Sequence, residues 1–558
     1  MKKPDIKFIE LVAVLLAGIG LFAIPNPLIQ LLGKLTVLGS FLYALWVFLP
    51  WLRFMEEAKK IPPLFIHMLY GSVITLVLIG AGFTVYRYVV VSKIENMSGV
   101  TTPQIKPIAV LAFDDMSPDK DQEWFCDGIS DAILNALTHV GDLQVPGRTS
   151  TFSFKGKDAS FAEIGRQLNV ESVLEGSIVK SGNRLRITAQ LIKADNGFHL
   201  WSKTYNRETE DVFPLIEEIS LKIVEALKVN LLSSEKAAIE KRPTEDSDAY
   251  ELYLLGRHYL EMRTKEGIER ALYYFNEAIK IDPDYALAHA GIADTYHYVG
   301  SFGLMPTKDA YPEAKKAADR ALEIDPTLAE AYISLAIINT WYFWDFQSAK
   351  YNLDQALKFS PGNSRIYYRY FTYYQVMRQF DEGLIILQKA IEFNPLRHIL
   401  FWHLVMEYCR VGRYDEAWDA LDKIEVKFSN RVNDNNFLRA TIYFSQGNYK
   451  DAIRILENVV NKHIYQLMYL GYAYGMVGEK EKAEKIINNI KESSGITSTH
   501  IAFVYLGMGE NNKALELLEK AYEDKEPTFI DSIFFKEYDN LRSAPRFKAL
   551  LKKMGLPE

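Results

Sequence analysis

The sequence predicts a multidomain chain with three parts: N-terminal transmembrane helices, an α/β (α+β) domain, and an all-α right-handed solenoid of helical hairpins. Three observations predict this order. Long uncharged runs occupy the first hundred residues, mixed strand and helix periodicity follows, and from residue 248 the chain repeats itself. The length of 558 residues fits three or four domains of about 100–200 residues each.

Charge is divided unevenly along the chain. The whole chain has 64 basic and 71 acidic residues, a net charge of −7. Residues 1–100 hold nine basic and five acidic residues and are net +4, so the remainder is net −11. An acidic body argues against nucleic acid as a partner, because such proteins carry a basic face. Two cysteines exclude a disulfide-rich scaffold and a four-cysteine zinc site.

Residues 1–92 are predicted to form a membrane anchor. Leu35–Leu52 and Leu64–Tyr86 contain no charged residue, and a spanning helix needs about 20 apolar residues. The first apolar stretch also fits a signal peptide, but no small-residue cleavage site follows it. Two spans instead of three stay an alternative. The predicted transmembrane helices lie at about 8–24, 29–52 and 64–88.

The flanking charges predict an orientation for this anchor. Basic residues before the first span and in the 53–63 loop place both in the cytoplasm. Three spans then put the body on the far side, whereas two spans would leave it in the cytoplasm. Glu10, Lys34 and His67 fit either a proton or ion relay or side chains that reach the interface, and we favour the second interpretation.

After a linker at 93–104, residues 105–232 are predicted to form a sheet covered by helices. The order of elements is β-α-β-α-β-β-β-α, which indicates an α/β or α+β domain. Ser160 and Glu163 fit a capping box that opens a helix, and Gly182-Asn183 and Asn196-Gly197 are typical of hairpin turns. The predicted strands cover 108–113, 143–146, 172–179, 184–192 and 198–205, and the predicted helices cover 122–139, 160–168 and a segment from Asp211.

Several segments of this region resemble a known bacterial family, the TolB amino-terminal-like (FlgO-like) domain. They are IAVLAFDDMS, WFCDGISDAILNAL, GRTSTFSFKG, IGRQLNVESVLEGSIVKSGNRLRITAQLI and GFHLWSKTYNRETEDVF. The chain departs from the family pattern at Ala112 and Cys126. The resemblance implies a sensory, cell-envelope or accessory module with no catalytic residue to carry over. It also implies a bacterial source, so the predicted location is multi-pass in the inner (cytoplasmic) membrane, with a periplasmic body.

Motifs for catalysis, cofactors and metals are missing from the sequence. The acidic run from Asp114 to Asp121 lacks the glycine and glutamate of an EF-hand and reads as a solvated turn. Cys126 is typical of a buried, inert thiol, and Gly147–Ser150 alone is weak evidence for an anion site. No P-loop, G-x-S-x-G, H-E-x-x-H or G-x-G-x-x-G occurs. The prediction is a non-enzymatic protein with no catalytic, cofactor-binding or metal-binding residues.

From 248 to 527 the chain repeats a phrase that ends at Pro283, Pro326, Pro361 and Pro395, with spacings of 43, 35 and 34 residues. Small residues recur where two helices would cross. The pattern resembles the tetratricopeptide repeat (TPR), in which helical hairpins of about 34 residues stack into a superhelix. We count about eight repeats, followed by a capping helix at 528–558. In similar bacterial proteins the N-terminal module is a cyclase, a DNA-binding domain or a kinase; here the predicted anchor occupies that place.

The predicted function is that of a membrane-embedded scaffold or adaptor that binds a protein or peptide partner in the concave groove of the solenoid. Exposed aromatic residues and arginine are typical of peptide-binding surfaces, although the same residues also fit packing between repeats. His289 and His297 are spaced too far apart for a helical metal pair and are interpreted as packing residues. The candidate groove residues are Arg365, Tyr368, Gln375, Trp402, Met406, Phe437, Met468 and Tyr472.

An alternative is a regulatory or sensory subunit of a membrane signalling system. In that hypothesis the α/β domain binds a small-molecule ligand and the membrane helices transmit the signal. An enzyme with an unrecognised site in 105–232 is the weakest hypothesis, because no nucleophile is paired with a base there.

Overall fold

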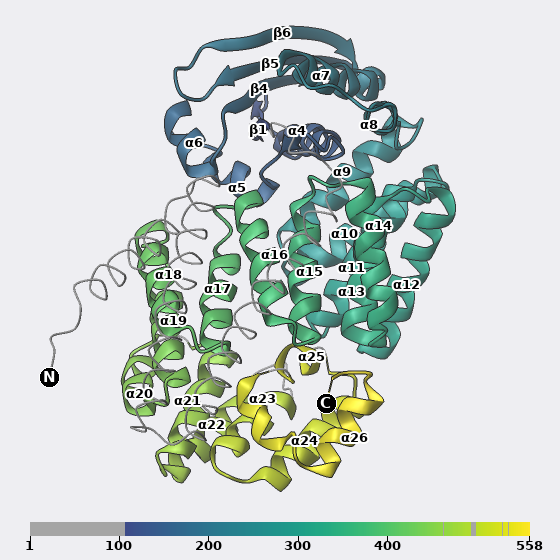
Figure 1. Cartoon of the computed structure of the whole chain (residues 1–558). Helices are drawn as coiled ribbons and strands as arrows, with labels where there is room; N and C mark the ends of the chain where they lie inside the picture. The colour runs from purple at the N-terminus through teal and green to yellow at the C-terminus, as the bar shows by residue number, and fades with distance from the viewer. Residues whose placement is uncertain (1–105, 461, 493–497, 527, 534, 558) are drawn as a thin grey trace, which may run out of the picture. The chain divides into compact units, whose positions relative to one another are not determined.

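The computed structural model describes residues 106–557, except 461, 493–497, 527 and 534 (Figure 1). A mixed sheet begins this part of the chain, with strand order β3-β1-β4-β5-β6, and β2 pairs with β4. β1 is parallel to both β3 and β4, whereas β4, β5 and β6 form an antiparallel meander. The strands are β1 (Lys106–Val110), β2 (Asp114–Asp115), β3 (Leu143–Gln144), β4 (Ser172–Ser181), β5 (Arg184–Lys193) and β6 (His199–Glu208).

Helices cover both faces of the sheet, as the alternation of side chains along β1 and β4 requires. Ile108 and Leu174 share a buried cluster with α4 and α7. Their neighbours Ala109 and Val173 instead join a cluster with α6. The helices of this region are α4 (Glu123–Thr138), α5 (Arg148–Thr151), α6 (Phe161–Leu168), α7 (Val212–Ala226) and α8 (Ser233–Ile239).

Local sequence signals explain where these elements begin and end. The side chain of Ser160 accepts a hydrogen bond from the backbone N–H of Glu163, so it caps α6 as the sequence pattern indicated. Gly182, with φ of 56°, turns the chain between β4 and β5. Asp211 is the residue before α7, as expected. The short helices α5 and α8 carry too little periodicity to be predicted.

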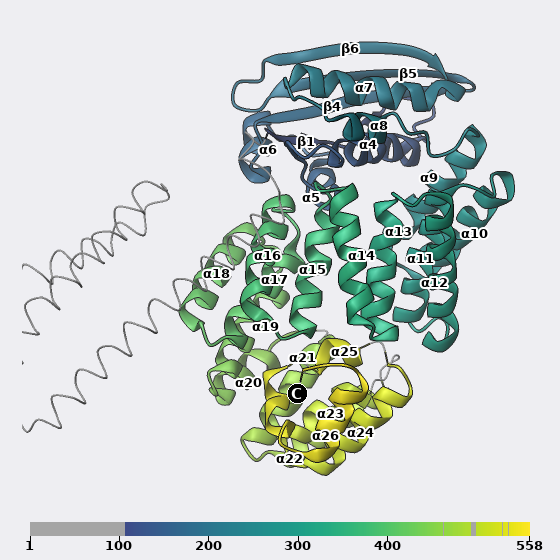
Figure 2. The ribbon, with the colours of Figure 1, turned by 45° about the vertical axis from the view of Figure 1, so that its right-hand side comes forward.

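Eight helical hairpins follow within the described residues. The first helix of each hairpin precedes its partner by a short turn, and neighbouring hairpins pack side by side (Figures 1 and 2). They are α9 (Ser247–Glu261) with α10 (Lys265–Ile281), α11 (Ala286–Ser301) with α12 (Thr307–Ile324), α13 (Ala329–Ile338) with α14 (Phe346–Phe359), α15 (Ser364–Val376) with α16 (Phe380–Phe393), α17 (His398–Arg410) with α18 (Tyr414–Lys427), α19 (Val432–Ser445) with α20 (Tyr449–Glu457), α21 (Ile464–Met476) with α22 (Lys480–Glu492), and α23 (Ser498–Gly507) with α24 (Asn511–Glu523).

Small and aromatic residues have different roles in packing these hairpins. The recurring alanines, such as Ala278 and Ala356, are fully buried, which lets neighbouring helices approach closely. Aromatic rings fill the remaining space; Tyr367 stacks on Phe393 with ring centroids 4.9 Å apart. This use in the repeats accounts for much of the aromatic content of the chain.

The C-terminal segment packs back against the third and fourth hairpins (Figures 1 and 2). It consists of α25 (Phe529–Ser532), a 3-10 turn at Lys536–Leu541 and α26 (Pro545–Lys553). Just before it, the ammonium of Lys525 lies 3.3 Å from the centroid of the Trp344 ring and donates to the Tyr342 carbonyl at 3.2 Å. Arg378 pairs with Asp539 at 3.1 Å. These contacts join residues more than 150 positions apart in the sequence.

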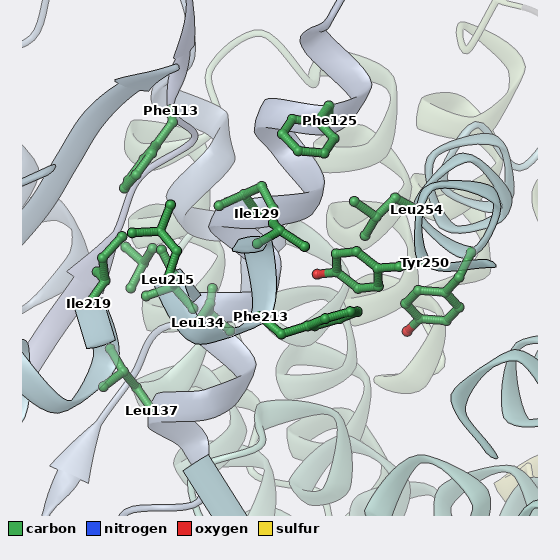
Figure 3. Packing of buried hydrophobic residues seen from close by; sticks show 14 of the residues in the cluster. Phe113, Phe125, Ile129, Leu134, Leu137, Phe213, Leu215, Ile219, Tyr250 and Leu254 are labelled. Carbon is green, nitrogen blue, oxygen red and sulfur yellow. The ribbon is translucent and has the colours of Figure 1, made fainter. Parts of the chain in front are cut away.

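The α/β region is joined to the solenoid through one continuous apolar core. Phe213 of α7 lies against Tyr250 of α9, with ring centroids 4.5 Å apart (Figure 3). Polar contacts continue this junction: Thr138 accepts a backbone hydrogen bond from Gly362 at 2.9 Å, and Ser150 donates to Asn394 at 3.2 Å. The two regions are therefore held by both side chains and backbone.

The membrane part of the predicted fold class, and with it the multi-pass inner-membrane location, is corrected by the structure. Among the described residues, which are mostly helical, no helix is both long and apolar enough to cross a bilayer. The longest repeat helices are amphipathic; α12, for example, carries Lys315, Asp319 and Glu323 on one side. The predicted helices at 8–24, 29–52 and 64–88 and the linker at 93–104 lie outside the described residues.

Candidate binding surface

The eight predicted groove residues lie on the first helices of four consecutive hairpins, α15, α17, α19 and α21. Their exposure divides them into two groups. Five are buried, because the following hairpins and the C-terminal segment pack on them. The buried residues are Gln375, Met406, Phe437, Met468 and Tyr472.

The buried group belongs to the core of the solenoid. Phe437, Met468 and Tyr472 share one apolar cluster with residues of the C-terminal segment. Gln375 donates its amide to Glu407, which also receives Arg410 and is itself fully buried. Side chains in such positions stabilise the fold and offer no surface to a partner.

Arg365, Tyr368 and Trp402 remain partly exposed. Arg365 binds Asp294 of α11 at 2.7 Å, and the Tyr368 hydroxyl lies 3.1 Å from His403 Nε2. Trp402 stacks on Phe437 with ring centroids 6.2 Å apart and an interplanar angle of 19°. Each of the three is thus oriented by a buried or half-buried neighbour.

Arg365 belongs to a larger group that we call the arginine cluster: Arg148, Arg257, Arg263, Arg365, Arg369 and Arg397. These residues come from α5 or from the ends and faces of α9, α15 and α17. Only Arg263 is exposed, and the other five are half-buried. The cluster includes side chains of the α/β region and of three separate hairpins, and shared neighbours link them: Asp131 for Arg148 and Arg257, and the Tyr368 ring for Arg369 and Arg397.

Carboxylates neutralise half of the arginine cluster. Asp131 of α4 lies 3.5 Å from Arg257 and 3.7 Å from Arg148, so it bridges the solenoid and the α/β region. Arg148 also contacts Asp127 at 3.4 Å. Asp294 receives Arg365 and the Ser334 hydroxyl, both at 2.7 Å. Burial opposes its ionisation, but Arg365 and Ser334 outweigh burial and hold the pKa of Asp294 below its ordinary value.

Two histidines beside the cluster are neutral at physiological pH. Burial, followed by the charge of Arg369, lowers the pKa of His297 to about 3. Burial, followed by the charges of Arg410 and Arg397, lowers the pKa of His403 to about 3. His403 therefore contributes a neutral ring that orients Tyr368. His297 lies 3.2 Å from the Tyr311 hydroxyl, and His289 contacts the Pro283 carbonyl at 3.0 Å, so the two histidines do not converge.

The other sequence candidates have structural roles. Asp115 accepts the backbone N–H groups of Ser117 and Gln122, both at 2.8 Å, and so closes its own loop. Burial raises the pKa of the Cys126 and Cys409 thiols to about 12. Within the described ranges, no group of three or more His, Cys, Asp or Glu residues is arranged to hold a metal ion.

Sequence reasoning found Arg365 but missed the rest of the arginine cluster. One signal was available: Arg365 and Arg369 are four residues apart and so share a face of α15. Arg397 and Arg263 lie in turns at helix ends, and only the stacking of hairpins brings them to that face. Arg148 lies between Gly147 and Ser150, both of which form hydrogen bonds to the solenoid.

Comparisons with known proteins give partial resemblances. No family model matches the chain. A candidate adenylate cyclase of Rhizobium meliloti (strain 1021) is 34% identical over 251 residues, which cover 44% of this chain and 43% of that protein. The transcriptional regulator HilA of Salmonella typhimurium (strain LT2) is 21% identical over 347 residues, 59% of each chain. The chain thus spans about two fifths to three fifths of the length of these relatives.

Solved structures of repeat proteins also resemble part of the chain. The type IV pilus biogenesis factor PilW covers 38% of this chain and 90% of its own, at 18% identity and a TM-score of 0.32. YrrB, described as a TPR protein with an unusual peptide-binding site, covers 35% of this chain and 95% of its own, at 20% identity and a TM-score of 0.26.

Proposed function

We propose that this chain is a non-enzymatic scaffold or adaptor that holds a protein or peptide partner on the first helices of its solenoid. The α/β region serves in this proposal as a docking or sensing module fixed to the first hairpins. The observation that carries the proposal is the row of half-buried, pre-oriented side chains Arg365, Tyr368 and Trp402. Aromatic residues and arginine in such settings supply most of the binding energy of peptide interfaces.

Rigidity supports the same function. Each of the three side chains is held by a neighbour, so little conformational entropy is lost when a partner binds. Asp294 fixes Arg365, and His403 fixes Tyr368. Helix α4 packs against α9, and the two helices share one buried apolar cluster. A partner bound to the solenoid would thus meet a preformed surface.

A peptide-display selection on the full chain tests this proposal. Peptides enriched on the parent protein are measured again on Tyr368→Ala and Trp402→Ala, and we expect each variant to weaken binding about tenfold or more. Tyr351→Ala is the matched control, because Tyr351 is 57% exposed on the second helix α14. Equal binding to the parent and to both inner variants would refute the assignment of this surface.

A further inference from the structure

In the part of the chain that the structure describes, three arginines of the cluster have no carboxylate within ion-pair distance. Within residues 106–557, apart from the gaps noted above, no ion pair forms at Arg263, Arg369 or Arg397. Their neighbours Arg148, Arg257 and Arg365 each have an acidic partner, so Asp131 and Asp294 are already occupied. Two further carboxylates lie beside paired arginines: Asp127 is 3.4 Å from Arg148, and Glu261 is 4.0 Å from Arg257.

Aromatic rings hold the unpaired arginines in place. The guanidinium carbons of Arg369 and Arg397 lie 5.4 Å and 4.9 Å from the centroid of the same ring, that of Tyr368. Arg369 is also 5.5 Å from the Trp341 ring, and Arg263 is 5.7 Å from that of Tyr298. These contacts position the planar groups without neutralising them, because a ring carries no net charge.

Like charges lie close together in this part of the arginine cluster, and a bound anion would reduce their repulsion. Burial lowers the pKa of Arg369 and Arg397, and each of the two is lowered further by a neighbouring arginine. A chain that is net −11 beyond residue 100 nevertheless concentrates positive charge here. Such a local contrast attracts anions and raises their concentration at the surface.

Phosphate suits Arg369 and Arg397, which contact the same ring, and the neighbouring Arg263 better than a single carboxylate does. It carries about −1.5 to −2 charges and three strong acceptor oxygens at neutral pH, whereas a carboxylate carries one charge and two oxygens. Arginine donates paired N–H groups in a fork that matches phosphate oxygens. The carboxylates of Asp294 and Glu261 remain near the cluster, but their charges are shared with Arg365 and Arg257.

We propose that Arg263, Arg369 and Arg397 bind the phosphate group of a small phosphorylated molecule at the inner surface of the first five hairpins. This ligand site goes beyond the proposed scaffold function and does not depend on it, because it rests on unpaired charge and not on Tyr368 or Trp402 contacting a partner. Arg148 and Arg257 link the same surface to α4 through Asp131. Binding of phosphate would thus affect the ion pairs at the junction between the solenoid and the α/β region.

Titration calorimetry of the full chain with inorganic pyrophosphate, at constant ionic strength, tests the proposal. We expect saturable binding by the parent and a loss of about tenfold or more in affinity for Arg369→Gln and Arg397→Gln, since each removes charge-assisted hydrogen bonds. Arg454→Gln is the control, because Arg454 is on the outer helix α20 and its side chain is 70% exposed. We expect this control to bind like the parent.

A second measurement separates loss of the site from loss of folding. Without phosphate, the thermal unfolding temperature of Arg369→Gln should equal or exceed that of the parent, because the substitution removes repulsion within the cluster. Arg397→Lys keeps the charge but not the fork, and should weaken pyrophosphate binding less than Arg397→Gln does.

Three results would overturn the proposal. One is the absence of pyrophosphate binding by the parent above that of sulfate at equal ionic strength. Another is unchanged binding by both glutamine variants. The third is saturable binding of hexaglutamate, lost in the glutamine variants, when pyrophosphate does not bind; that result would assign the surface to an acidic peptide. Failure of this test leaves the peptide-display result unaffected, because the two experiments use different ligands and variants.

Discussion

The inner surfaces of the first five and the last three hairpins are built on the same repeat but differ in exposure. In α9, α11, α15 and α17, arginine and tyrosine side chains remain half-buried and reach the surface. In α19, α21 and α23, the corresponding positions hold Phe437, Met468, Tyr472 and Phe503, all of them buried. The difference shows that repeat position alone does not make a residue available for binding; what packs on the position decides it.

The largest expected effect on stability comes from a substitution in the buried inner surface of the last three hairpins. Phe503 is fully buried, and its ring lies 4.8 Å from that of Tyr472 and 5.7 Å from those of Phe535 and Tyr538. Phe503→Ala should lower the free energy of unfolding by about 3–5 kcal/mol, because it leaves a cavity between hairpins and C-terminal segment. Urea denaturation measures this value. Phe302→Ala, at a half-exposed turn, should change it by less than about 0.5 kcal/mol.

The next effect concerns the junction between α4 and the first five hairpins, whose inner surface is partly exposed. A Cβ atom on Gly362 would lie 2.9 Å from the backbone oxygen of Thr138 and 3.0 Å from its Cα. Gly362→Ala should therefore push α4 away from the solenoid and destabilise the chain by about 1–3 kcal/mol. Hydrogen exchange should show faster exchange at the Gly362 amide, which donates to Thr138. Gly383→Ala is the control, since its Cβ would meet Tyr374 Cβ at 3.6 Å, an ordinary contact.

A third substitution makes the inner surface of the first five hairpins more basic, and so increases its difference from the buried surface of the last three. Asp294→Asn removes the carboxylate that neutralises Arg365, and should cost about 2 kcal/mol of stability because a half-buried cation loses its partner. The same change should tighten pyrophosphate binding by the arginine cluster. Asp319→Asn, at an exposed ion pair with Lys315, should alter neither quantity measurably. A weaker affinity for pyrophosphate in Asp294→Asn would contradict the electrostatic account.

The last expected effect is on the pH dependence of stability. His403 has a folded-state pKa of about 3, below the value of about 6.5 in an unfolded chain. Between these values the unfolded chain binds more protons, so stability falls as the pH decreases from 6.5 toward 3. One such histidine contributes a slope of about 1.4 kcal/mol per pH unit at most. His403→Gln should reduce the slope between pH 6 and pH 4; an unchanged slope would show that folding does not lower the pKa of His403.

Local patterns in the sequence predicted much of the described fold. The alternation in Arg184–Ile192, the cap at Ser160 and the turn at Gly182 each act over a few residues, and the structure has them as expected. The helical hairpins were predictable for a related reason: the crossing alanines recur in register, and the helices they join are neighbours in sequence.

The candidate surface was only partly predictable, because exposure depends on contacts far apart in the chain. Counting from crossing positions identified the inner helices but gave no sign that the C-terminal segment would help to bury Phe437, Met468 and Tyr472. The spacing of Arg365 and Arg369 was visible, but the approach of Arg397 and Arg263 depends on how the hairpins stack. The junction between the α/β region and the solenoid has no short-range signal at all, because Gly362 and Thr138 are separated by 224 positions.

The contact between Lys525 and Trp344 has a consequence for the order of events on the ribosome. Trp344 is synthesised 181 residues before its partner, so at about 5–20 residues per second it waits about 10–40 s. During that interval the first hairpins can stack with their neighbours, but the Trp344 ring lacks its later-synthesised partners Lys525, Tyr522 and Phe529. A protein whose closing contact comes last is exposed to off-pathway association at that ring until translation ends.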